Sequence, residues 1–132
     1  MSTLEFYTTL TALWLSLAWV PYILDRILVR GFMETLANPN SDQVPQSAWA
    51  QRAKRAHYVS VETFVVFAPL AVIAMIRMPD DAYAGTLAMT YFIGIFAHYI
   101  VYMLGIILIR TLAFALAALS ATGLALHLLG IT

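Results

Sequence analysis

Six polar side chains interrupt or border long apolar segments of this chain, at spacings that place several of them on shared helix faces. They are Arg30, Arg55, Glu62, His98, Tyr102 and Arg110. Glu62 is the clearest signal, because an ionisable residue inside a bilayer is costly and usually has a functional reason to be there. Arg55 precedes Glu62 by seven residues and His98 precedes Tyr102 by four, so each pair shares a helix face.

These groups predict a cationic site for an anionic ligand in one half of the membrane. Three arginines, Arg30, Arg55 and Arg110, are expected to ring it, with Glu62, His98 and Tyr102 facing it from slightly deeper. Arginine offers a planar fork of donors that matches a carboxylate. Glu62 would then bind an ammonium group of the ligand, or pair with Arg55 or Arg110. A structural ion pair and a ligand site are both open interpretations at this point.

The composition indicates that these side chains are positioned by membrane helices. Of 132 residues, 62% are hydrophobic, against about 45–50% in soluble domains. A soluble domain of this size could not bury that much apolar surface. Seven basic and seven acidic residues cancel, which excludes a nucleic-acid binder with a broad basic surface. The chain has no cysteine, which excludes disulfides and thiolate sites of its own.

Four apolar segments are long enough to cross the roughly 30 Å hydrocarbon core as helices. The predicted spans are residues 4–24, 57–76, 82–104 and 107–129. A cytoplasmic loop over residues 27–56 connects the first span to the second. One long third helix with a short fourth is an alternative parse. We interpret the first segment as a span and not as a cleaved signal peptide, because it lacks a basic start and a small-residue cleavage site. The predicted fold class is an all-α, integral membrane four-helix bundle.

The basic residues orient this bundle. Six of the seven Lys and Arg residues fall in the first connection or at Arg110 in the third, and only Arg77 falls on the other side. The positive-inside rule therefore places these connections in the cytoplasm and both termini on the far side. A bacterial inner membrane fits this pattern, with membrane lipids as the surroundings.

Other chemistries have less support. The histidines at 57, 98 and 127 lack metal-ligand spacing, so no metal site is predicted. No glycine-rich phosphate loop is present. A transporter or channel subunit is disfavoured, because no line of polar residues runs from one face to the other.

Two motifs resemble the MAPEG family, the membrane-associated proteins in eicosanoid and glutathione metabolism. The stretch RAKRAHYVSVE from Arg52 to Glu62, followed by VVFAPL from residue 65, resembles the second-helix motif, which reads roughly R-A-x-R-A-H-x-N-x-x-E. HYIVY from His98 and RTLAF from Arg110 resemble the segment of the third and fourth helices. The resemblance covers nearly the whole chain, with the motifs in the right order.

The resemblance implies a homotrimer that binds glutathione between subunits and delivers its thiol to a lipophilic small molecule. By position, the glutathione-binding residues would be Arg30, Arg55, Glu62, His98, Tyr102 and Thr111, and the catalytic residue would be Arg110. An adjacent arginine favours the thiolate form of a thiol.

Three departures from the family pattern weaken this implied site. The motif asparagine is Val59, a position that is basic in some members is Tyr58, and an arginine before the third-helix histidine is Ile95. Each lost hydrogen bond to a charged group costs about 1.5–3 kcal/mol. The predicted function is therefore a glutathione-dependent transferase or peroxidase with an altered site. The alternative is a non-catalytic membrane protein that binds a lipid or amphipathic anion in the same clefts.

Overall fold

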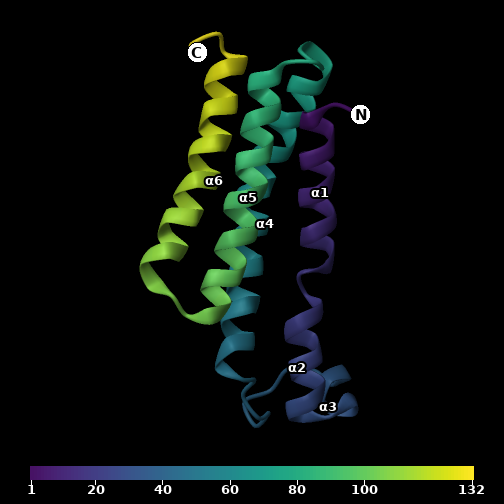
Figure 1. Cartoon of the computed structure of the whole chain (residues 1–132). Coiled ribbons are helices and arrows are strands. Elements are labelled where there is room, and N and C mark those ends of the chain that lie inside the picture. Colours follow the sequence, from purple (N-terminus) through teal and green to yellow (C-terminus); the bar gives the residue numbers. More distant parts are fainter.

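The computed structural model describes all 132 residues and contains six helices and no strand. The helices are α1 (Thr3–Leu17), α2 (Val20–Arg30), α3 (Phe32–Leu36), α4 (Ala48–Arg77), α5 (Ala82–Leu104) and α6 (Ile107–Leu128). Four segments are long and apolar enough to span a membrane, with α1 and α2 together forming the first. They lie side by side with both termini at one end and α3 at the other (Figure 1). The predicted four-helix membrane bundle is thereby confirmed.

The first span consists of two helices, α1 and α2, with a short break between them. Helix α1 ends at Leu17 and α2 starts at Val20, with Pro21 in the first turn, where a missing N–H costs nothing. The Tyr99 hydroxyl donates to the Ala18 carbonyl at 2.8 Å, which satisfies a backbone group freed by the break. This span continues to Arg30, six residues past the predicted end.

Helix α4 begins at Ala48, nine residues before the predicted start of the second span, so the irregular connection is shorter than the predicted loop. Ala50, Ala53 and Ala56 are fully buried at a spacing of three and pack in one cluster with Tyr22 and Tyr99. The polar residues between them occupy the other faces. Hydropathy therefore falls before residue 57, where the apolar span starts, but the helix itself already begins at Ala48. Helices α2 and α4 extend beyond the α5–α6 turn at the end far from the termini (Figure 1).

The third and fourth spans agree more closely with the sequence. Helix α5 covers Ala82–Leu104, the same residues as the predicted third span, and α6 ends one residue before the predicted 129. The two are joined at Gly105, which has φ +81°, a left-handed conformation that glycine adopts without strain.

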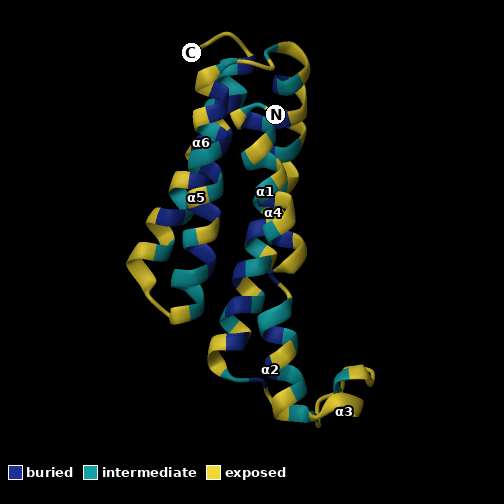
Figure 2. Cartoon of the chain, turned by 45° about the vertical axis from the view of Figure 1, so that its right-hand side comes forward, coloured by how far each residue is buried: buried dark blue, intermediate teal, exposed yellow.

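The core is narrow and lies along the facing sides of the helices, while the outward sides stay exposed and apolar (Figure 2). The rings of Phe67 and Tyr91 stack with centroids 3.9 Å apart, and the Tyr91 hydroxyl lies 3.0 Å from the Thr63 hydroxyl. Large side chains such as Leu28 and Ile76 are 85% and 77% exposed. An outward apolar surface of this kind suits lipid as the solvent.

Helices α5 and α6 pack closely at Gly94. A Cβ atom at this position would lie 2.8 Å from the Ala117 nitrogen and 2.9 Å from the Ala113 oxygen. Small residues of this kind let membrane helices approach through their backbones. This contact sets the position of His98 on α5 relative to Arg110 in the first turn of α6.

Asp81 caps α5 at the end near the termini. Its carboxylate accepts from the Ala84 N–H at 2.7 Å and lies 3.3 Å from Nε2 of His127. The Ala84 N–H first, and the His127 side chain second, hold the pKa of Asp81 below its usual value. A carboxyl with a lowered folded-state pKa stabilises the fold above its unfolded pKa, and this contribution is lost as the pH falls through the folded value.

We expect Asp81→Ala to lower the free energy of unfolding by about 1 kcal/mol, the usual cost of losing a helix N-cap. Asp81→Asn keeps an acceptor for the Ala84 N–H and should recover most of this loss. Thermal unfolding in detergent at neutral pH measures both variants. Equal stability of Asp81→Ala and the natural chain would show that the cap contributes nothing.

Candidate functional site

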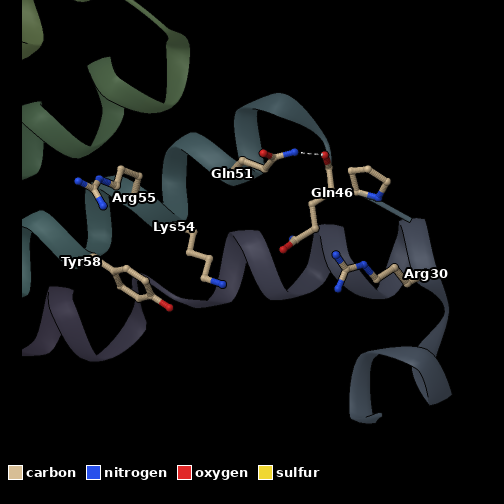
Figure 3. Close-up of a pocket in the computed structure, with 7 residues that line it drawn as sticks. Arg30, Gln46, Gln51, Lys54, Arg55 and Tyr58 are labelled. Atoms are coloured by element: carbon tan, nitrogen blue, oxygen red, sulfur yellow. Dashed lines mark hydrogen bonds between the residues drawn. The ribbon is translucent and has the colours of Figure 1, made fainter. Parts of the chain in front are cut away.

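Two of the predicted site residues, Arg30 and Arg55, line a cavity between α2 and α4 at the predicted cytoplasmic end. This cavity of about 420 Å³ is lined by Arg30, Pro45, Gln46, Gln51, Lys54, Arg55 and Tyr58. Three of these side chains are cationic and none is acidic. Lys54 and Gln46 point into the space between the two helices, whereas the Arg55 guanidinium extends away from α2 (Figure 3). The cavity therefore suits an anionic group.

Arg30 is held in place by the loop that it faces. Its Nε donates to the Val44 carbonyl at 2.6 Å, and its Nη1 donates to Oε1 of Gln43 at 3.3 Å. Neither partner carries a charge, so the positive charge of Arg30 stays available to a ligand.

A buried polar network fixes the wall of this cavity. The Gln46 amide nitrogen donates to the Tyr22 carbonyl at 2.6 Å and to Oδ2 of Asp25 at 3.4 Å, and its oxygen accepts from Nε of Arg26 at 3.3 Å. Asp25 is only 4% exposed, and its carboxylate also accepts from the Ser47 N–H. Asp25 on α2 thereby binds the residue that precedes α4. The network pins the loop to α2.

Four other predicted site residues lie where α5 meets the start of α6. They are His98, Tyr102, Arg110 and Thr111. His98 Nδ1 donates to the Arg110 carbonyl at 3.1 Å, because a carbonyl can only accept. Its Nε2 is buried and has no partner in the chain. The Arg110 guanidinium carbon lies 4.5 Å from the centre of the Tyr102 ring, and the His98 and Tyr102 rings meet edge to face at 5.4 Å. Stacking on Tyr102 therefore holds the Arg110 charge next to His98.

This group opens into a second, smaller cavity. Its volume is about 230 Å³, and its lining residues are Val59, His98, Arg110, Thr111 and Phe114. The Thr111 hydroxyl donates to the Ile107 carbonyl at 3.3 Å, so it can still accept from a ligand. No carboxylate lies within 4 Å of Arg110.

The structure does not join the predicted residues into one ring within a single chain. Arg30 and Arg55 line the first cavity, while His98, Arg110 and Thr111 line the second. Helix α4 separates the two, because Tyr58 lines one and Val59 the other.

Glu62 has neither of the partners predicted for it. No Arg lies within 4 Å of its carboxylate, since the single ion pair of the chain joins Asp81 and His127. The expected pairing with Arg55 or Arg110 is therefore wrong within one chain. Glu62 is exposed, four residues after Tyr58 and three after Val59, on the α4 face between the two cavities. Its charge is left uncompensated on an apolar span.

Comparison with known protein families identifies the family of this chain. The family model described as MAPEG family matches residues 4–130. The chain belongs to the MAPEG family. It is accordingly a multi-pass integral membrane protein, with four apolar helices in a lipid environment. No curated protein matches the chain.

Two of the departures from the MAPEG pattern lie at the cavities, and one does not. Val59 and Tyr58 each line a cavity, so both alter what a ligand meets there. Ile95 is fully buried in the core cluster with Phe67 and Tyr91. The Ile95 side chain faces the core and lines neither cavity.

Several residues that line or shape the cavities were not predicted from the sequence. Lys54, Gln51 and Phe114 line them, and Gln46 and Asp25 fix the loop. Lys54 could have been found from its place beside Arg55 in the motif. Gln46 and Asp25 carry no local signal, because their pairing spans 21 residues of chain.

Proposed function

We propose that this MAPEG protein is a glutathione-dependent transferase or peroxidase that acts on lipophilic small molecules. The observation that carries the proposal is the Arg110 cation, which is stacked on Tyr102 without an acidic partner and next to the unpartnered His98 Nε2. A cation positioned in this way favours an anionic sulfur over a neutral thiol. A buried nitrogen without a partner is costly unless a ligand satisfies it.

The donors of the two cavities fit glutathione, which has two carboxylates, one ammonium group and one thiol. Arg30, Lys54 and Arg55 would bind carboxylates, and Glu62 would bind the ammonium. When bound, glutathione would supply the thiol nucleophile. Arg110 would stabilise negative charge at its sulfur, and Thr111 would accept or donate a hydrogen bond nearby. The apolar Val59 and Phe114 would keep water away from this end of the site.

A homotrimer would complete the site. The uncompensated Glu62 on an apolar span supports coverage of the α4 face by a second copy, because a carboxylate facing lipid is costly. The cavities on either side of this face would then each become part of a cleft between subunits. The basic connections support a bacterial inner membrane location with both termini outside the cytoplasm.

Val59→Asn tests whether the second cavity is a weakened glutathione site. An added amide in this cavity should form a hydrogen bond to a charged ligand and raise glutathione affinity by about tenfold. The control is Val61→Asn, because Val61 is 41% exposed on α4 but lines neither cavity. Isothermal titration with the purified protein measures both. An equal effect of the two substitutions would contradict the assignment of the cavity.

The direct test of the proposed function is a shift of the melting temperature on titration with millimolar glutathione. A ligand that binds only the folded state raises the melting temperature by mass action. No shift, and no turnover of a lipophilic electrophile or hydroperoxide, would overturn the enzyme proposal. Turnover alone would separate the enzyme from a non-catalytic protein that binds a lipid or amphipathic anion, since only the enzyme consumes the thiol.

A further inference from the structure

A third cavity lies on a different side of the bundle and shares no residue with the two described above. Its volume is about 450 Å³, and its lining is mostly apolar. We call it the tryptophan groove; its main residues are Trp14, Trp49, Arg52, Tyr99, Ile100 and Met103. Helices α1, α4 and α5 therefore all contribute to it.

The groove has one charged end. Arg52 is its only ionisable cation, and the Arg52 Nε donates to the Met103 carbonyl at 2.9 Å, one residue before the end of α5. The other guanidinium nitrogens make no hydrogen bond in the chain, and no carboxylate lies within 4 Å. The charge thus lies at the end of α5, a helix of 23 residues. A helix of this length spans the hydrocarbon core, so we expect its end to reach the depth of the lipid headgroups.

The other end of the groove runs back into the apolar span. Trp14 lies within α1, and its ring meets the Tyr99 ring edge to face at 5.2 Å. The Trp14 indole nitrogen is buried and has no acceptor in the chain. Trp49 is 38% exposed near the start of α4, at the charged end.

We propose that the tryptophan groove binds one anionic phospholipid, with its phosphate at Arg52 and an acyl chain along Trp14 and Ile100. An uncompensated cation at headgroup depth attracts an anionic headgroup, and an aromatic, apolar wall below it matches an acyl chain. The proposal does not depend on glutathione chemistry, because the groove and the two cationic cavities lie apart.

The chain offers a matched control for Arg52. Arg77 lies at the opposite end of α4, where its Nη1 donates to the Leu128 carbonyl at 3.3 Å near the end of α6. Each arginine thus caps the end of a helix, but only Arg52 lines the tryptophan groove. Leu104 is 61% exposed at the rim, so Leu104→Glu adds a carboxylate there without removing the bond from Arg52 to Met103.

Native mass spectrometry of the purified full chain tests the proposal, with phosphatidylglycerol and phosphatidylcholine of equal acyl chains as probes. We expect the natural chain to prefer phosphatidylglycerol about fivefold, the size of one cation acting on an anionic headgroup. Arg52→Gln and Leu104→Glu should each abolish this preference, and Arg77→Gln should leave it unchanged.

Three results would overturn the proposal. The first is a natural chain without a preference. The second is a preference that survives in Leu104→Glu, a variant that reports even if Arg52→Gln fails to fold. The third is a change of oligomeric mass in Leu104→Glu, which would mean that a second copy and not a lipid covers the groove. A photoactivatable phosphatidylglycerol should crosslink within residues 14–21 and 99–104; crosslinks confined to α6 would also contradict the assignment.

Discussion

Gly94→Ala is expected to lower the free energy of unfolding by about 1–3 kcal/mol, the typical cost of overpacking a well-packed core. The new Cβ would lie 2.8–3.0 Å from atoms of Ala113 and Ala117, two of them backbone atoms that cannot rotate away. Helices α5 and α6 would have to separate, and this would also disturb the bond from His98 to the Arg110 carbonyl. Thermal unfolding in detergent measures the loss.

Gly123→Ala on α6 is the matched control. A Cβ there would lie 3.2 Å from the end of the Leu87 side chain, which can adjust. Alanine is the better helix former, so this variant should be as stable as the natural chain or more stable. If Gly94→Ala behaved like Gly123→Ala, the close approach of α5 and α6 would not be essential to the fold.

Arg110→Gln is expected to reduce turnover of glutathione with a lipophilic electrophile by about 100-fold, the usual effect of removing one group that stabilises developing negative charge. The fold should survive, because His98 binds the backbone carbonyl of residue 110 and not its side chain. Glutamine keeps a hydrogen-bond donor but lacks the charge, so the variant isolates the electrostatic contribution.

Arg77→Gln provides the comparison for charge removal as such, since Arg77 lies at the opposite membrane face and lines neither cationic cavity. Its turnover should equal that of the natural chain. Loss of turnover in both variants would indicate a general effect on folding or insertion. Full turnover in Arg110→Gln would show that another group stabilises the sulfur.

The sequence was sufficient for the spans but not for the helix ends. Long apolar runs bounded by charges predict crossings of the bilayer, and the predicted third span, residues 82–104, coincides with α5. The start of α4 could not be predicted in the same way. Its first nine residues alternate buried alanines with polar side chains, and only the packing against Tyr22 and Tyr99 shows that they are helical.

Some contacts of the candidate site were predictable from the sequence, and others were not. The four-residue spacing of His98 and Tyr102 correctly predicts neighbouring side chains on α5. Burial of Ile95 could not be predicted from its own helix, because that depends on which face of α5 meets α4. The contacts of Asp25 with residues 46 and 47 depend on how the loop folds back, and no local spacing encodes that return.

The proposed role of Arg110 is to stabilise the anionic sulfur of bound glutathione, and difference absorbance of the thiolate measures this stabilisation. With the purified natural chain at neutral pH, titration with glutathione should produce a saturable thiolate band, which Arg110→Gln should lose. No thiolate band from the natural chain at millimolar glutathione, or an equal band from Arg110→Gln, would contradict this role of Arg110.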